Sequence, residues 1–119
     1  MQTLTDAPAQ ARTPVDAARI LVARLSGRYD IQGAAMYDSL ENGAVRRDGL
    51  NLAVLLREEI RDPEAVALDM GGDALILFLE SGVHITPLPV FHGHWQDPAA
   101  APDPRFISRI KMKSIWLWL

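Results

Sequence analysis

Three histidines fall within eleven residues, and histidine is the residue type in this chain best suited to binding a transition metal. His92 and His94 are two residues apart, and on a β-strand side chains at this spacing project from the same face. His84, from a neighbouring strand, would add a third imidazole. A metal site also needs side chains that orient its ligands, and nothing in the sequence marks any. We therefore prefer the interpretation in which the histidines surround a turn and the sheet surface, and we expect no cofactor.

Two acidic residues, Asp69 and Asp73, flank the pair Gly71-Gly72. Such carboxylates can bind a hard cation or transfer protons, but beside a turn they usually accept hydrogen bonds from the turn backbone. The chain has no cysteine, which excludes a thiolate ligand and a cysteine nucleophile, and no serine lies in a Gly-x-Ser-x-Gly motif. We predict no catalytic residue and expect that the chain is not an enzyme.

The C-terminal segment combines basic and aromatic residues, a pairing that can track phosphates and stack on bases. Its basic residues are Arg105, Arg109, Lys111 and Lys113. A nucleic-acid interface is therefore one alternative. The net charge of −3 provides no general attraction to phosphate, so we prefer an edge strand that its cations protect from self-pairing.

The elements that must position these residues begin with helices. Residues 1–12 have no hydrophobic period and should form a mobile tail. Thr13-Pro14 is a helix start, and the helix should end at Ser26-Gly27. A second helix is predicted over 30–41. A third, with Leu52, Leu55, Leu56 and Ile60 on one face, should end before Pro63.

Beyond Pro63 the pattern changes to that of strands separated by glycine turns. Residues 66–70, 73–80 and 83–87 read as an antiparallel meander, with a possible further strand over 90–95. The middle strand is apolar on both faces, so it needs a cover on each. An extended Pro/Ala spacer over 96–104 should lead to a C-terminal strand over 105–119.

Together these patterns predict one α+β domain over residues 13–119, with three N-terminal helices on an antiparallel sheet of four or five strands. The surplus of apolar surface favours a non-catalytic protein-interaction module, either homo-oligomeric or bound to another protein. The predicted interface comprises the apolar residues of the C-terminal segment: Phe106, Ile110, Met112, Trp116, Leu117, Trp118 and Leu119.

The composition agrees with a single soluble domain, with 119 residues of which 49% are hydrophobic. No stretch has the pattern of a secretory signal or a membrane span, so we expect a cytoplasmic protein without a membrane partner. The abundance of alanine and arginine favours a GC-rich bacterial genome. A metal-binding protein or metalloenzyme built on the histidines remains a second alternative to the interaction module.

Overall fold

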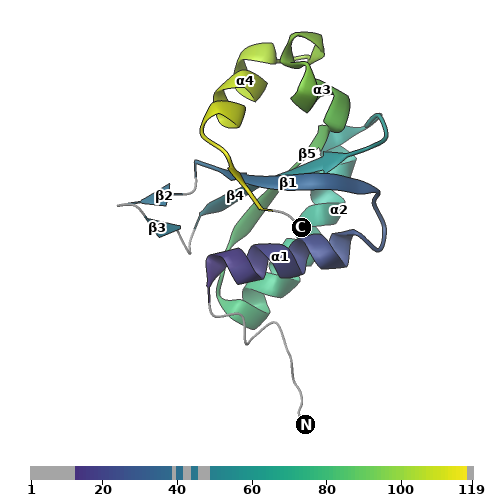
Figure 1. Cartoon of the computed structure of the whole chain (residues 1–119). Helices are drawn as coiled ribbons and strands as arrows, with labels where there is room; N and C mark the ends of the chain where they lie inside the picture. The colour runs from purple at the N-terminus through teal and green to yellow at the C-terminus, as the bar shows by residue number, and fades with distance from the viewer. Residues whose placement is uncertain (1–12, 39, 42–43, 46–48, 118–119) are drawn as a thin grey trace.

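The computed structural model describes residues 13–38, 40–41, 44–45 and 49–117, along which helices and strands are interleaved (Figure 1). The elements of the first half are α1 (Pro14–Leu25), β1 (Ile31–Tyr37), β2 (Leu40–Glu41), β3 (Ala44–Val45) and β4 (Leu50–Leu56). Those of the second half are α2 (Pro63–Ser81), β5 (Ile85–Phe91), α3 (His92–Gln96), the short 3-10 helix η3 (Pro98–Ala100), α4 (Pro104–Met112) and β6 (Ile115–Trp116).

Four strands form a mixed sheet in the order β5-β4-β1-β6. β1 is antiparallel to both of its neighbours, with Ala34 opposite Val54 of β4 and Met36 opposite Ile115 of β6. β4 and β5 are parallel because α2 carries the chain back across the sheet between them. The fold is α+β, as predicted, but the predicted antiparallel sheet is wrong because one of its pairings is parallel.

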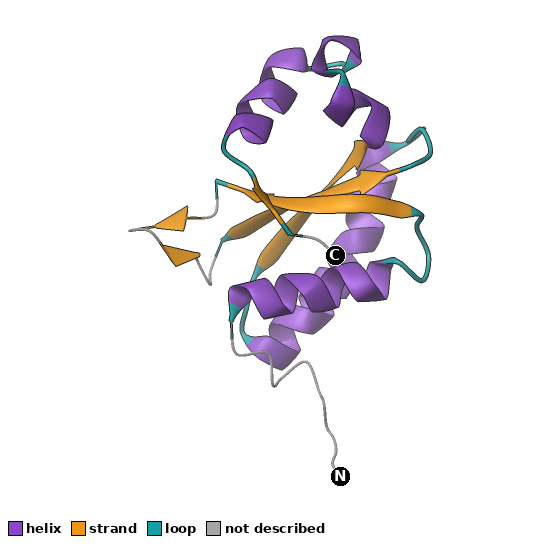
Figure 2. Cartoon of the chain, in the orientation of Figure 1, coloured by secondary structure: helices purple, strands orange, loops and turns teal. Residues whose placement is uncertain are grey.

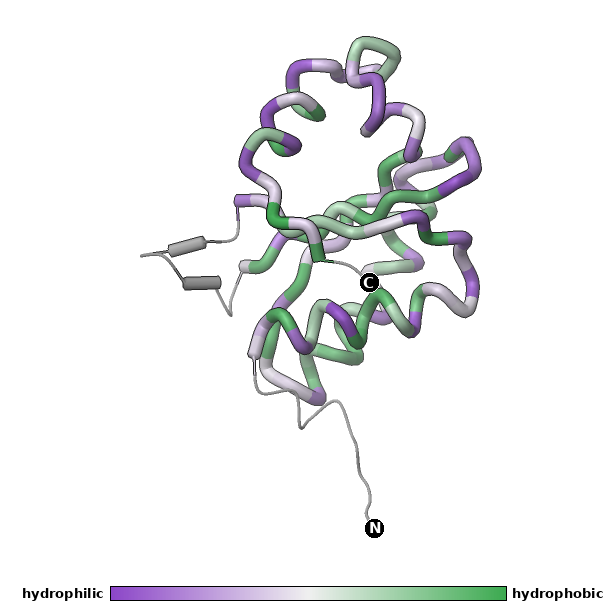
Figure 3. Tube along the Cα trace, in the orientation of Figure 1, coloured by the Kyte–Doolittle hydropathy of each residue, from purple (hydrophilic) through white to green (hydrophobic). Residues whose placement is uncertain are grey.

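Helices cover both faces of this sheet (Figure 2). α1 and α2 pack on one face, against side chains that include Leu52 and Val54. α3 and α4 cover the other face, where the core includes Ala53 and Leu55. Successive side chains of a strand point to opposite faces, so a strand covered on both sides is apolar nearly throughout. β4 has this character, and Figure 3 shows the apolar strands at the middle of the molecule.

The prediction of three N-terminal helices is wrong, since only α1 forms. Its start is as predicted, because the Thr13 hydroxyl accepts a hydrogen bond from the Asp16 N–H at 3.0 Å. The segments predicted as the second and third helices contain β1 and β4 instead. A run such as residues 52–56 is apolar at every position, so it satisfies helical and strand spacing equally.

The predicted meander is also wrong. Residues 66–80 belong to α2, which continues through Gly71-Gly72 without a turn, and only the end of the third predicted strand lies in β5. Each glycine lowers helix stability by about 1 kcal/mol relative to alanine. Packing against α1 and β5 compensates for this cost over a helix of 19 residues. Within the described part of the chain, no helix has the length and apolarity needed to cross a membrane.

The predicted C-terminal strand is wrong over most of its length, because residues 104–112 form α4 and only Ile115–Trp116 is a strand. β6 nevertheless returns to the sheet, and the Leu117 N–H donates to the carbonyl oxygen of Ala34 at 2.9 Å. The predicted extended spacer contains η3. The predicted mobile tail and the last two residues, Trp118 and Leu119, lie outside the described residues.

Gly33 explains how β6 reaches β1. A Cβ atom placed on Gly33 would lie 2.6 Å from Cζ2 of Trp116, closer than carbon atoms approach without displacement. The glycine therefore lets the indole of β6 lie directly against the neighbouring strand.

Candidate interaction surface

Local signals fix both ends of helix α2. The Asp62 carboxylate accepts a hydrogen bond from the Ala65 N–H at 3.1 Å, and Pro63 occupies the first helical position. At the other end Gly82 has φ of 75°, a left-handed conformation that glycine adopts without steric cost, and its N–H donates to the carbonyl oxygen of Phe78. With both ends fixed, each face of the helix has a definite environment.

The inner face of α2 belongs to the hydrophobic core. Met70 and Leu77 are fully buried and Ala74 is 5% exposed. Their spacing of four and then three residues places them on one side of the helix, against α1 and the sheet. This face anchors the helix to the domain.

One flank of α2 is joined by ion pairs to α1 and to the turn that follows α1. The Arg28 guanidinium, in that turn, donates to a carboxylate oxygen of Asp69 and to one of Asp73, each at 2.9 Å from Nη2. Arg24, in the last turn of α1, pairs with Glu80 at 2.9 Å. These pairs occupy the polar flank of α2.

On this flank, the Asp69 carboxylate accepts hydrogen bonds from two side chains of the turn after α1. The hydroxyl of Tyr29 and then the guanidinium of Arg28 donate hydrogen bonds to it, and both lower its pKa. Burial raises the pKa of Tyr29, as does its hydrogen bond to Asp69. The prediction that Asp69 and Asp73 flank a turn is wrong, because both lie within α2 and bind Arg28.

The outer face of α2 is apolar and uncovered. Leu68, Leu75 and Leu79 are 78%, 57% and 75% exposed, and their spacing of seven and four residues places them on one line along the helix. Gly71 and Gly72 lie between the first two leucines, and a Cβ atom on either glycine would meet no atom within 4 Å. We call these five residues the outer stripe.

Two further apolar side chains widen this face, Ile76 on the α1 side and Phe78 on the β5 side. The five exposed large side chains together leave on the order of 500 Å² uncovered, toward the upper end of the largest apolar patch on a typical monomer. A patch of this size on one helix is typical of a surface that another molecule covers.

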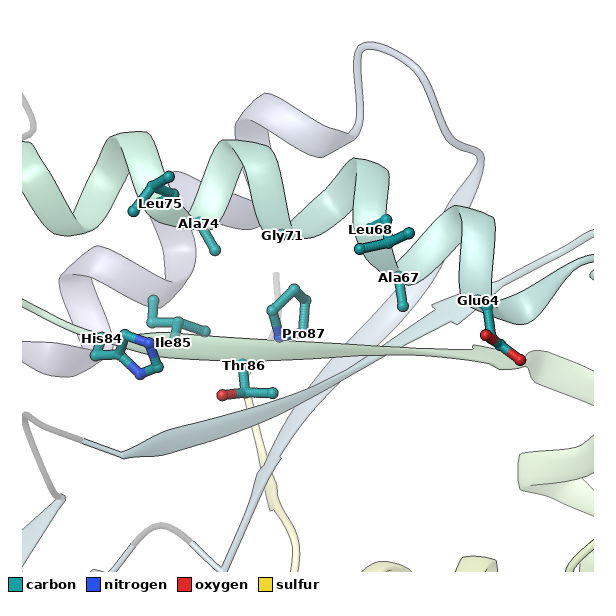
Figure 4. A pocket seen from close by; sticks show the side chains of 10 residues that line it. All are labelled: Glu64, Ala67, Leu68, Gly71, Ala74, Leu75, His84, Ile85, Thr86 and Pro87. Carbon is teal, nitrogen blue, oxygen red and sulfur yellow. The ribbon is translucent and has the colours of Figure 1, made fainter.

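A groove of about 500 Å³ runs beside the outer stripe, between α2 and the edge strand β5 (Figure 4). Ala67 and Ala74 form part of its helix wall and Pro87 part of its strand wall. Glu64 lies at one end and His84 at the other, where the His84 ring packs edge-on against Phe78 at a centroid distance of 5.7 Å. The two polar ends thus differ in chemistry, a carboxylate and an imidazole.

The free edge of β5 is unsuited to pairing with another strand. The His84 carbonyl oxygen accepts from the Leu50 N–H at 3.1 Å, so even-numbered positions of this segment bond to β4 and odd-numbered ones face outward. Pro87 and Pro89 are odd-numbered and have no N–H to donate. A partner at this side of the molecule must therefore contact side chains rather than extend the sheet.

The residues predicted as an interface at the C-terminus are divided between environments. Ile110 and Leu117 are buried, and they lie in the two cores on opposite faces of the sheet. Phe106 is half-buried against Tyr37, whereas Met112 and Trp116 are 85% and 52% exposed. The described members of this set are therefore not all available at the surface, and their role as an interface stays a prediction.

The basic residues of the nucleic-acid alternative lie on or just after α4, not on a strand. Arg109 pairs with Asp38 at 2.8 Å, and Nζ of Lys111 donates to the carbonyl oxygen of Trp95 at 2.7 Å. Arg105 and Lys113 are exposed. Two of the four cations therefore already bind groups of this chain.

The strand geometry assumed for the histidine cluster is wrong. His92 and His94 lie on the helix α3, where residues two apart do not share a face, and His94 packs edge-on against Phe91. His84 lies at the end of the groove already described. Among the residues whose placement is described, no three His, Asp or Glu side chains are grouped as metal ligands.

No known family model matches this chain, and no curated protein is significantly similar to it in sequence. Its function must therefore be inferred from the molecule's own surfaces. The outer stripe was missed in the sequence because residues 66–80 were assigned to strands. Its signal was present as leucines at positions 68, 75 and 79, a helical repeat separate from the buried set at 70, 74 and 77.

Proposed function

We propose that this chain is a protein-interaction module and that its binding surface is the outer stripe of α2 together with the adjoining groove. The observation that carries the proposal is the exposure of Leu68, Leu75 and Leu79 on a helix whose other sides are packed or ion-paired. Covering a side chain of this size contributes about 1.5–3 kcal/mol. Three such leucines in one line are typical of a helix that packs against a partner.

The surroundings of the stripe support the same function. Ion pairs with α1 and with the turn after it lie on the flank of the helix that carries the stripe. The prolines of β5 disfavour association by pairing of edge strands, which would be an alternative way for two chains to bind. A partner would therefore meet a rigid apolar helix bordered by a groove, which requires little rearrangement on binding. The C-terminal residues first expected to form the interface would then serve mainly to complete this chain's own sheet and core.

Affinity purification of the tagged full-length chain from its host tests this function. The double variant Leu68→Glu/Leu75→Glu places two carboxylates on the stripe, and Met112→Glu places one on a remote exposed site. We expect the wild type and the Met112 variant to retain a stoichiometric partner, whether a second copy or another protein, and the double variant to lose it. Retention of the same partner by a folded double variant would contradict the proposal.

A further inference from the structure

We infer that the partner on the outer stripe is a second copy of this chain, packed with its α2 antiparallel about a twofold axis at the Gly71-Gly72 step. This inference rests on the proposed function and names its partner. Three features of the stripe and its borders support it: the order of its side chains, its glycine pair and the polar group at each end of the groove.

The order of side chains makes the stripe complementary to itself. Gly71 and Gly72 lie midway between Leu68 and Leu75. An antiparallel copy centred on the glycines places Leu68 of one chain opposite Leu75 of the other, and the twofold axis repeats the contact. Apolar groups therefore meet apolar groups twice in one interface.

Within the described part of the chain, no other segment packs against the positions where Gly71 and Gly72 lack a side chain. A Cβ atom on Gly71 or Gly72 would meet no other atom within 4 Å, so alanine would fit at both positions. Glycine in the middle of a helix lowers its stability, and this cost is unexplained in the isolated chain. At a crossing of two helices, glycine lets the backbones approach closely and lengthens the contact of the flanking leucines.

The polar groups at the two ends of the groove favour the antiparallel orientation, in which a carboxylate meets an imidazole. Glu64 and His84 lie at opposite ends of the groove in Figure 4. Reversing the direction of the second copy brings the Glu64 end of one chain toward the His84 end of the other at both sides of the axis. A parallel arrangement would instead place the two glutamates together and the two imidazoles together.

The area available is also appropriate for a dimer of ordinary size. A standard interface covers about 800 Å² on each partner. The exposed apolar side chains of α2 supply more than half of this area, and the walls of the groove supply further surface on the β5 side. The outer face of α2 and the groove together therefore approach the area of a standard interface, without a contribution from the far side of the sheet.

Disulfide trapping combined with sedimentation tests this arrangement. The chain has no cysteine, so Gly72→Cys introduces a single thiol, and a disulfide forms only where two Cα atoms come within about 7 Å. The added side chain weakens the contact of the two helices at the glycine step, so oxidation is carried out at high micromolar concentration, where we expect Gly72→Cys to form a covalent dimer and the exposed control Met112→Cys not to. Wild-type protein should sediment as a dimer at high micromolar concentration, and Leu75→Glu should weaken association roughly a hundredfold.

The outcomes separate this inference from the function on which it rests. A wild type that stays monomeric at high micromolar concentration, with no trapping at position 72, would overturn the homodimer. If a different protein were then retained by the wild type and lost by Leu68→Glu/Leu75→Glu, the interaction module would stand with another partner. A dimer that forms but resists both Leu75→Glu and trapping at Gly72→Cys would place the interface elsewhere and also overturn the inference.

Discussion

The Arg28 guanidinium and the Tyr29 hydroxyl converge on Asp69, and this small cluster joins the turn after α1 to the flank of the helix that carries the outer stripe. Exposed ion pairs contribute little singly, but here one guanidinium binds two carboxylates while a phenol binds one of them. Because both donors favour the ionised form of Asp69, its pKa in the folded chain lies below the ordinary value of about 3.9. The cluster therefore stabilises the fold when Asp69 is charged.

The substitution Asp69→Asn tests the role of this charge. A carboxylate with a lowered folded-state pKa stabilises the fold above the unfolded pKa of about 4, and the contribution is lost as the pH falls through the folded pKa. We expect the variant to melt below the wild type at neutral pH and the difference to vanish in acid. Thermal unfolding across this pH range measures it, with Asp97→Asn, an exposed acid after α3 on the other face of the sheet, as control. A difference that stays constant with pH would contradict the assignment.

At the scale of elements, one sequence signal marks the start of each long helix. Thr13-Pro14, Asp62-Pro63 and Asp103-Pro104 each combine a capping side chain with proline at the first helical position. In each case the capping oxygen accepts a backbone N–H three residues on. The first of these signals correctly predicted α1. The second was read only as the end of a preceding helix, and the third as part of a spacer, so α2 and α4 were missed.

The contributions of the two apolar faces of α2 to stability can be distinguished by introducing the same charge on each face. Leu77→Asp puts a carboxylate in the core without a partner and should cost several kcal/mol, enough to unfold a domain of ordinary stability. Leu75→Asp, two residues earlier on the outer stripe, should change the free energy of unfolding by less than about 0.5 kcal/mol in dilute solution. Chemical denaturation of both variants measures these effects, and equal losses would show that the outer stripe belongs to the core.

A substitution in the glycine pair should change folding stability and self-association in opposite directions. Gly72→Ala adds a methyl group where the chain has open space, so we expect the free energy of unfolding to rise by about 0.5–1 kcal/mol in dilute solution. The same methyl group should weaken self-association because it separates the crossing helices. Denaturation and sedimentation of the one variant measure both effects. A variant that is more stable and associates as strongly as the wild type would show that close approach is not needed there.

At the scale of the whole molecule, the sequence predicted the α+β class and the need for a cover on each side of an apolar strand. The structure supplies these covers as α1 with α2 and α3 with α4, but around β4 rather than around residues 73–80. The order of elements could not be predicted because a strand that is buried on both faces lacks the alternating polar positions by which a strand is distinguished from a helix. The parallel pairing of β4 with β5 then followed from the helix α2 that had been missed.

The location of the candidate site depended on the same element. The sequence predicted a surplus of apolar surface. It placed that surface at the C-terminus, whereas the structure exposes apolar side chains on α2. Leu117 and Ile110 are taken up by the chain's own cores, whereas the leucines of α2 are not. Distinguishing the two sets required knowing which side of each element faces the sheet, and this depends on contacts between segments distant in sequence.

The most direct measurement of the central proposal is site-specific photo-crosslinking in the cells that produce the protein. A benzophenone amino acid replaces Leu75 on the outer stripe in one variant and Met112 in a matched control, and the mass of each adduct is determined. The account predicts an abundant adduct from position 75 with twice the mass of the chain, and little from position 112. Equal or absent adducts from the two positions, with both variants folded, would contradict the proposal that a partner covers the outer face of α2.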